Sequence, residues 1–272
     1  MRHFLVTLKT NSVHIYPICD TQIGAPGGAD LHGFRKWVKE ARADPLARFV
    51  GVGDYVDGLS PSNRKNLLAA FVKGDLYDTA REMLNDSAIR QVQHFQKLIG
   101  GTEGKWDAVA AGHHFWEWTA DGHVYNTDMM IADLVGAPYT PEGESAVITY
   151  KFRNGQTFRL WMRHGENGGG SFAGPINQLE KMMRAFTADA YLIGHHHKLV
   201  GARAVKLSER PGHPTELLAT DSVLVCAGSW MRGYMPGMST YAEAAMMVPL
   251  ATGAPVIRAR AKKDGLQVRV EI

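Results

Sequence analysis

Residue types that bind metal ions recur at the ends of five predicted strands in this sequence. The clearest segment is Gly53-Asp54-Tyr55-Val56-Asp57-Gly58, which follows the apolar run Phe49-Val50-Gly51-Val52. A β-branched and aromatic run ending in Gly-Asp predicts a buried strand that brings a carboxylate to a sheet edge, where open α/β sheets bind ligands. An isolated Asp-Gly step is also ordinary turn chemistry, so the other segments decide its meaning. They contribute, in chain order, Asp20 and Gln22, His113 and His114, His164, and His195, His196 and His197.

Carboxylates and imidazoles in this pattern could hold a pair of divalent ions. Two such ions, bridged by one carboxylate, can bind two phosphate oxygens and lower the pKa of a bound water towards neutrality. Asp20 and Gln22 are two residues apart, so an extended backbone would project both side chains to one face, where they could share an ion. With Asp20 and Asp54 ionised and the histidines neutral, two divalent ions leave a net charge of about +2, which suits a phosphate.

The three consecutive histidines close a predicted strand at 190–193. Alternate residues at a strand end project to the same side, so His195 and His197 are expected to reach two neighbouring ions. His196 should point away from them.

The rest of the chain predicts the elements that must position these side chains. Strands at 13–19 and 48–52 enclose a helix that begins after the N-cap Asp30 and runs to about Ala43. This order implies a parallel strand pair with a right-handed crossover. Further strands are predicted at 3–8, 106–111, 147–152, 157–162, 190–193, 199–206, 223–227, 256–262 and 266–271, and further helices at 75–99, 127–135 and 175–186.

A polar and basic segment at 60–66 is predicted to form a loop beside the site. Its residues Asn63, Arg64 and Lys65 are candidates for contacts with a substrate phosphate. A solvated helix start is the alternative that the pattern favours over such contacts. The run Gly168-Gly169-Gly170 could also present N–H groups to a phosphate, but it lacks the Lys-Ser/Thr of a phosphate-binding loop.

The length and composition are those of an ordinary globular protein. With 272 residues and no internal change in composition, a single domain is expected over residues 1–272. The formal net charge of +3 tolerates a phosphate substrate but is no nucleic-acid signature by itself. Cys19 and Cys226 lie in apolar runs and are interpreted as core residues of a protein in a reducing compartment. No signal peptide or membrane span is predicted, so we expect a cytoplasmic protein without a membrane partner.

The order of the site segments resembles the five motif blocks of the calcineurin-like metallophosphoesterase superfamily. Those blocks are Asp-x-His, Gly-Asp-x-x-Asp, Gly-Asn-His, His and Gly-His-x-His, each after a successive strand. The corresponding residues here are Asp20-Thr21-Gln22, Gly53-Asp54-Tyr55-Val56-Asp57, Gly112-His113-His114, His164 and Gly194-His195-His196-His197. The second and fifth blocks match fully. The resemblance implies an α/β fold, a metallophosphoesterase-type sandwich of two mixed β-sheets flanked by helices in the order αββα.

The resemblance also implies a role for each matching residue. Asp54 would bridge two divalent metal ions. The first metal site would be completed by Asp20, Gln22 and His197, and the second by His113, His164 and His195. His114 would stabilise the transition state or protonate the leaving group, while Asp57 would orient the turn through hydrogen bonds.

Two positions depart from the family pattern and affect the choice of metal. Gln22 stands where histidine is usual, and His113 stands where asparagine is usual. The first site becomes richer in oxygen and is expected to take Mn²⁺ or Mg²⁺, whereas the second, richer in nitrogen, suits Zn²⁺, Fe or Mn²⁺. Mn²⁺ is therefore the ion expected first, with Zn²⁺, Fe and Mg²⁺ as alternatives.

Three functions follow from the resemblance. The favoured one is a phosphoesterase that uses a water activated by two metal ions. It would act as a phosphodiesterase on small or nucleotide-like substrates, with phosphomonoesters as the next substrate class. The second is a DNA nuclease, for which a basic and aromatic groove is needed. Candidates for that groove are Arg64, Lys65, Trp116, Trp118, Trp230 and Arg232. The third is a binding scaffold without activity, which the complete set of ligand side chains disfavours. The oligomeric state is left open.

Overall fold

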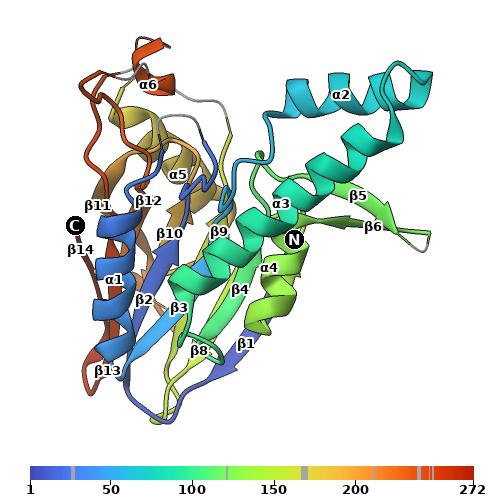
Figure 1. Cartoon of the computed structure of the whole chain (residues 1–272). Helices are drawn as coiled ribbons and strands as arrows, with labels where there is room; N and C mark the ends of the chain where they lie inside the picture. Colours follow the sequence, from blue (N-terminus) through green and yellow to red (C-terminus); the bar gives the residue numbers. More distant parts are fainter. Residues whose placement is uncertain are drawn as a thin grey trace.

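The computed structural model describes residues 1–25, 28–120, 122–166, 171–210, 212–237, 240–244, 246 and 248–272. These residues form two six-stranded mixed β-sheets, a two-stranded sheet and six helices (Figure 1). No helix among them is both long enough and apolar enough to cross a membrane. The glycine run at 168–170 lies outside the described residues.

The first large sheet contains most of the strands in the second half of the chain. Its strands lie in the order β1 (Arg2–Thr7), β8 (Ala146–Lys151), β9 (Thr157–Arg163), β10 (Ala190–Ile193), β12 (His213–Ala227) and β11 (Leu199–Arg210). β8 and β9 form the antiparallel hairpin that the sequence predicts. β10 runs parallel to both of its neighbours, β9 and β12, so the carboxyl ends of these three strands lie at one edge.

The second large sheet contains three strands from the first half of the chain and three from the second. Its strands lie in the order β14 (Gly265–Glu271), β13 (Val256–Lys262), β2 (Ser12–Ile18), β3 (Ala47–Gly51), β4 (Trp106–Ala110) and β7 (Tyr139–Thr140). β2, β3 and β4 are parallel, and α1 (Leu31–Ala43) connects the first two as the sequence predicts. The helix begins where expected, because Asp30 Oδ1 accepts a hydrogen bond from Gly33 N (3.1 Å) as its N-cap.

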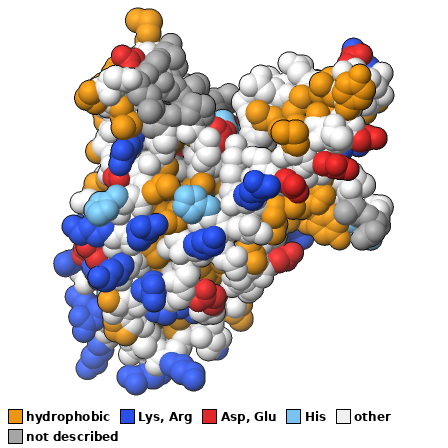
Figure 2. All heavy atoms as spheres, viewed as in Figure 1, with side chains coloured by type: hydrophobic (Ala, Val, Ile, Leu, Met, Phe, Trp, Pro, Cys, Tyr) orange, Lys and Arg blue, Asp and Glu red, His pale blue; other side chains and the backbone are white. Residues whose placement is uncertain are grey.

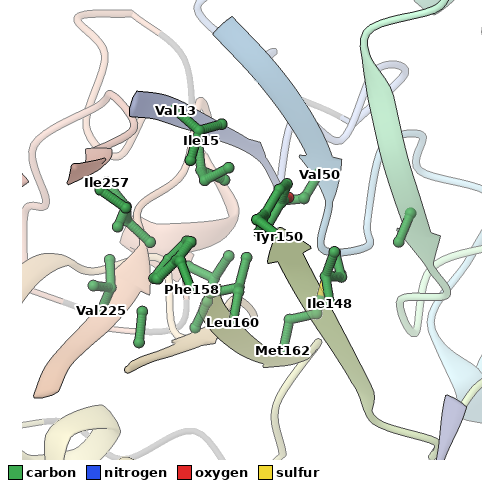
Figure 3. Close-up of a cluster of buried hydrophobic side chains, with 14 of the residues drawn as sticks. Val13, Ile15, Val50, Ile148, Tyr150, Phe158, Leu160, Met162, Val225 and Ile257 are labelled. Atoms are coloured by element: carbon green, nitrogen blue, oxygen red, sulfur yellow. The ribbon is translucent and has the colours of Figure 1, made fainter. Parts of the chain in front are cut away.

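Apolar side chains fill the space between the two sheets (Figure 3). Ile15 and Val50 from the second sheet meet Ile148, Leu160 and Val225 from the first, and all five are 0% exposed. The outer face of the second sheet is covered by α1, α3 (Asp78–Ile99) and α4 (Thr127–Val135), and that of the first by α5 (Ala173–Ala185). The layers therefore follow the order helix, sheet, sheet, helix, which confirms the predicted αββα sandwich.

The segment predicted as a loop at 60–66 is instead the beginning of a helix, α2 (Pro61–Lys73). Ser60 is its N-cap, with Oγ accepting from Asn63 N (3.4 Å), and Pro61 occupies the first helical position. Proline suits that position because its missing N–H would have no helical acceptor there. The loop prediction was wrong, and the alternative of a helix start is confirmed.

Two hairpins were missed or underestimated from the sequence. β5 (Glu117–Ala120) and β6 (His123–Asn126) form a hairpin that was not predicted, and β11 and β12 extend well beyond the predicted 199–206 and 223–227. Much of each hairpin is exposed on both faces, so neither shows the apolar-polar alternation of a half-buried strand. A short helix, α6 (Tyr241–Ala244), was also missed. We call residues 61–88 and 116–126 the arm; its α2, β5 and β6 project from one side of the sandwich (Figure 1).

A polar contact ties the two sheets together inside this apolar layer. Tyr150 of β8 donates its hydroxyl to Asp107 Oδ2 (2.9 Å), and Asp107 belongs to β4 of the other sheet. Arg48 of β3 donates its Nε to Asp107 Oδ1 (3.0 Å), which supplies the counter-charge of this carboxylate at 4% exposure. The three residues satisfy one another in a place where an unpaired polar group would be costly.

We expect Tyr150→Phe to lower the free energy of unfolding by about 1 to 2 kcal/mol, because it removes one hydrogen bond to a buried carboxylate. Urea denaturation measures the change, with Tyr125→Phe on the partly exposed β6 hairpin as the control that should stay within about 0.5 kcal/mol of the wild type. Equal stabilities for Tyr150→Phe and the wild type would show that the contact contributes nothing to the docking of the sheets.

Candidate metal centre

The five predicted segments meet at one edge of the sandwich, each just beyond the strand that precedes it. Asp20 follows β2, Asp54 follows β3, and His113 with His114 follows β4, so these come from one sheet. His164 follows β9, and 195–197 follows β10, so these come from the other. The site therefore lies across the junction of the two sheets.

Asp20 is the carboxylate at the end of β2 and is 0% exposed. Its Oδ2 accepts hydrogen bonds from His195 N (2.9 Å) and from Cys19 Sγ (2.7 Å). Its Oδ1 lies 3.1 Å from His197 Nε2 but has no hydrogen-bond partner among the described residues. Burial opposes the charged form, yet the neighbouring His197 outweighs it and lowers the pKa of Asp20.

Asp54 occupies the same place at the end of β3 and is 1% exposed. Its Oδ1 accepts from the backbone N–H groups of His113 (2.6 Å) and His114 (2.9 Å). Its Oδ2 lies 3.2 Å from His164 Nε2, and neither of these two buried atoms has a hydrogen-bond partner among the described residues. Burial opposes the charge of Asp54, but the His164 imidazole and the His114 amide hold the pKa of the carboxyl well below its ordinary value.

His164 is oriented by the backbone of β3's end. Its Nδ1 lies 2.6 Å from the carbonyl oxygen of Val52, and because a carbonyl can only accept, Nδ1 carries the proton. In the neutral ring Nε2 then keeps its lone pair, aimed at Asp54, which is the arrangement by which proteins orient metal-binding histidines. Burial disfavours a charge on this ring, yet the Asp54 carboxylate outweighs it and raises the pKa of His164 to about 9.

Three histidines from different strands gather around this point. The ring centroid of His113 lies 4.7 Å from that of His164 and 4.8 Å from that of His195, and one possible ligand atom from each ring lies within 4.8 Å of the others. Burial and the nearby His164 lower the pKa of His113 and of His195 to about 4. Both rings are therefore neutral near physiological pH, which is the state that binds a metal ion.

His114 is turned differently from its neighbour. Its Nδ1 lies 3.0 Å from Asp57 Oδ1, and its side chain is 27% exposed. Burial opposes protonation, but the Asp57 hydrogen bond and the Asp54 charge outweigh it and raise the pKa of His114. Solvent thus reaches part of the His114 ring, and Asp57 lies beside one of its nitrogens.

The backbone at the site is not extended, contrary to the reason given for pairing Asp20 with Gln22 and His195 with His197. All four have a positive φ, of 47°, 38°, 63° and 54°, and Asp54 has 55°. This left-handed region is uncommon for residues other than glycine, so the alternation of an extended strand does not apply here. Gln22 is buried all the same, and its backbone N donates to Asp54 O (3.0 Å).

The three consecutive histidines nevertheless separate as expected. His197 Nε2 faces Asp20, while the ring of His195 lies among His113 and His164. His196 is turned the other way, with Nε2 3.2 Å from Gln178 Oε1 of α5.

Two glycines permit the close approach of the turns that carry the ligands. Gly53 has φ 101°, and a Cβ there would lie 2.6 Å from Gly112 Cα and 2.5 Å from His164 Nδ1. A Cβ on Gly112 would in turn collide with the carboxylate and backbone of Asp54. Neither turn can carry a side chain at these positions without moving the ligands.

Asp128 is a functional neighbour that the sequence analysis missed. It lies in the first turn of α4, is 1% exposed, and accepts a hydrogen bond from Gly112 N through Oδ2 (2.8 Å). Burial, with a smaller contribution from the charge of Asp54, raises the pKa of Asp128 to about 7. An acidic residue in the first turn of a mostly apolar helix is the signal that could have identified it. Cys19 was taken only as a core residue, although its thiol contacts Asp20.

The three candidates for phosphate contacts all lie on α2 but differ in exposure. Asn63 and Lys65 are exposed, whereas Arg64 is 7% exposed and faces the site. Its Nη1 donates to the carbonyl oxygens of His113 (2.9 Å) and Phe115 (2.8 Å). The geometry of Arg64 therefore favours a role in holding the backbone over direct contact with a substrate.

The aromatic residues proposed for a nucleic-acid groove are mostly internal. Trp116 and Trp230 are 2% and 4% exposed, and Trp116 Nε1 donates to Asn85 Oδ1 (2.7 Å). Trp118 stacks on Tyr125 in the arm, and Arg232 pairs with Asp30 (3.1 Å). Trp116 and Trp118 line one pocket of the arm, whereas Arg64, Trp230 and Arg232 are not part of its lining.

Neither a protein-family model nor a curated protein matches the sequence. Among solved structures, Vps29 from Entamoeba histolytica in complex with Zn²⁺ is 11% identical over 96% of this chain and 98% of its own, with a TM-score of 0.35. A putative 5'-nucleotidase from Staphylococcus aureus is 11% identical over 95% of this chain and 53% of its own, with a TM-score of 0.47. The calcineurin-like phosphoesterase YfkN from Bacillus subtilis is 12% identical over 96% and 90%, with a TM-score of 0.33. These likenesses are too distant to assign an activity.

The chain itself shows the two-sheet architecture that the sequence predicts, with the motif segments at the strand ends that this architecture brings together. The donor set, with two carboxylates and several imidazoles around unpaired buried atoms, could hold a metal ion.

The raised pKa of Asp128 predicts how stability depends on pH. A folded-state pKa of about 7 against an ordinary value of about 3.9 means that the folded protein binds this proton more tightly, so stability falls as pH rises between these values. Asp128→Asn keeps an acceptor for Gly112 N and cannot ionise. Between about pH 5 and pH 7, the metal-free wild type should therefore lose on the order of 1.4 kcal/mol per pH unit relative to the variant. Urea unfolding measures this, and a difference independent of pH would contradict it.

Proposed function

We propose that the chain is a metal-dependent enzyme that hydrolyses phosphoester bonds. The observation that supports this most is the pair of buried carboxylate oxygens, Asp20 Oδ1 and Asp54 Oδ2, that face imidazole nitrogens without hydrogen-bond partners among the described residues. A buried charge needs a counter-charge, and a divalent ion between each of these oxygens and its imidazole would supply one. The histidines around them provide the further nitrogen ligands that divalent ions require.

In the proposed assignment Asp54 would bind two divalent ions. Asp20, Gln22 and His197 would complete one site, and His113, His164 and His195 would complete the other. Three of these residues present buried unpaired atoms at the right place, namely Asp20, Asp54 and His164. Because Gln22 adds an oxygen ligand, Mn²⁺ is our first choice, with Zn²⁺, Fe and Mg²⁺ as alternatives. When bound, the ions supply positive charge for the phosphate oxygens and a water of lowered pKa.

His114 is the residue we assign to the reacting phosphoester. Asp57 holds its Nδ1, so Nε2 is the nitrogen left to carry a proton towards the leaving-group oxygen. Its 27% exposure also makes it accessible to a substrate, whereas His164 at 4% is not. Asp57 then orients the acid and does not itself touch the substrate.

We propose a small phosphodiester or a nucleotide-like molecule as the substrate, with phosphomonoesters next. A DNA nuclease is the second candidate. Trp116 and Trp230 are buried, so two of the aromatic side chains expected to stack on DNA bases are not exposed. A scaffold would bind ions without turnover. Free, buried cysteines at positions 19 and 226 support a reducing compartment, and we propose a cytoplasmic location.

Removal of metal tests the proposal directly. Protein treated with a strong chelator, and shown by elemental analysis to be metal-free, should lose hydrolysis of aryl phosphodiesters and regain it best with Mn²⁺. Asp54→Asn is the matched control, since it keeps the shape of the side chain, lacks the bridging charge and should not regain activity. Full activity in the metal-free wild type would exclude this function, and ion binding without turnover on mono- and diesters, nucleotides and DNA would favour the scaffold.

The adjacent His113 and His114 should respond in opposite ways to substitution. His113→Asn supplies a ligand that the resembling family uses and should retain both ions and measurable activity. His114→Ala should retain both ions yet lower kcat by about 10²- to 10⁴-fold, the range for losing a positioned acid. The loss should be smaller for an activated aryl leaving group than for an alkyl one. If His114→Ala instead empties a metal site while His113→Ala does not, the two roles must be exchanged.

A further inference from the structure

The segment from Gly112 to Phe115 carries both His113 and His114, and its backbone is held from several directions. Asp54 Oδ1 binds two of its N–H groups from within the site. The carbonyl oxygen of His114 accepts from Gly58 N (2.6 Å). Two further side chains hold this segment from outside the metal centre.

The first of these side chains is Arg64, in the first turns of α2. Its Nη1 bridges the carbonyl oxygens of His113 and Phe115, and its guanidinium carbon lies 3.9 Å from the centroid of the Phe115 ring. Its Nη2 also lies 3.9 Å from Glu142 Oε2, a long ion pair with a partly exposed carboxylate. A guanidinium at 7% exposure is thus engaged mainly with neutral acceptors of one short segment, an expensive use of a charge unless that segment must be fixed.

The second is Asp128, which forms a hydrogen bond with the opposite end of the same segment. It accepts from Gly112 N (2.8 Å), the residue that immediately precedes His113. Asp128 belongs to the sandwich through α4, whereas Arg64 belongs to the arm. The segment is therefore clamped between the two parts of the molecule, with a donor side chain on its carbonyls and an acceptor side chain on its first N–H.

We propose that Arg64 and Asp128 are positioning residues that fix the Gly112–Phe115 segment so that His114 keeps its orientation towards the substrate, an inference that rests on the proposed phosphoesterase function. Neither residue touches the reacting atoms. The arm acts on catalysis through this contact, because α2 supplies Arg64.

Arg64→Met tests this, since methionine fills much of the same space over Phe115 without donating hydrogen bonds. We expect kcat to fall about 10- to 100-fold, KM to change less than about 3-fold, and the metal content to stay at the wild-type value. The control is Arg81→Met, which removes an exposed arginine stacked on Phe71 of the arm, 4.7 Å from the ring centroid, and should keep wild-type kinetics. A raised KM at unchanged kcat would overturn the proposal in favour of direct phosphate contact by Arg64.

A double-mutant cycle with His114→Ala separates positioning from general damage. If Arg64 acts through His114, adding Arg64→Met to His114→Ala should lower kcat by less than about 3-fold. The full loss of the single Arg64 variant, repeated in the His114→Ala background, would overturn the proposal. On the other side of the clamp, Asp128→Ala should resemble Arg64→Met, and Asp128→Asn, which can still accept from Gly112, should restore part of the loss. Equal activities for the two Asp128 variants would overturn the part of the proposal that concerns Asp128.

A measurement that needs no activity distinguishes this inference from the proposed function. In metal-free protein, the amides of His113 and His114 should exchange with deuterium at least about 10-fold faster in Arg64→Met than in wild type or Arg81→Met. Unchanged exchange would overturn the clamp even in an active enzyme. A wild type that hydrolyses no phosphoester with any ion would overturn the proposed function and the catalytic part of this inference, while the exchange rates would still decide whether Arg64 holds the segment.

Discussion

Two carboxylates withdrawn from water govern the organisation of this molecule. Asp20 and Asp54 are almost completely buried, and each uses one oxygen for hydrogen bonds from the backbone or a thiol and leaves the other facing an imidazole. A buried charge is tolerated only with a counter-charge and filled hydrogen bonds. The raised pKa of His164 shows how strongly the pocket demands positive charge. The imidazoles and the backbone N–H groups stabilise these two charges, and the proposed ions would do the same.

Meeting it requires a backbone that ordinary strands do not provide. Asp20, Gln22, Asp54, His195 and His197 all adopt positive φ. Strained backbone costs on the order of 1 to 3 kcal/mol per residue, less for Asp and His than for Gln, and persists only where the surroundings enforce it. Here the enforcement is visible, because His195 N is bonded to Asp20, and Asp54 receives two amides of the neighbouring turn. Each carboxylate thus fixes the backbone of the turn whose histidine lies beside it in the site.

The sequence predicts the features that depend on local pattern and on the order of motifs. Apolar runs ending in Gly-Asp or Gly-His locate the site residues, and the strand-helix-strand order gives the parallel pairs. Exposed hairpins such as β5–β6 leave no pattern, because neither face is buried. Asp128 and Arg64 were missed in their actual roles because each acts on a backbone group distant in sequence. The reason offered for the pairing of Asp20 with Gln22 also failed, since periodicity describes regular strands and the site begins where the strands end.

The position of the site across the two sheets links ligand binding to the assembly of the whole domain. Asp20, Asp54 and His113 arrive with the first half of the chain, and His164, His195 and His197 arrive with the second. A ligand that joins both groups binds only to the docked sandwich, so its binding free energy adds to the cohesion between the layers. Separation of the sheets would release it. Retention of such a ligand during unfolding would thus report on the apolar interface between the layers, some distance from the edge where it binds.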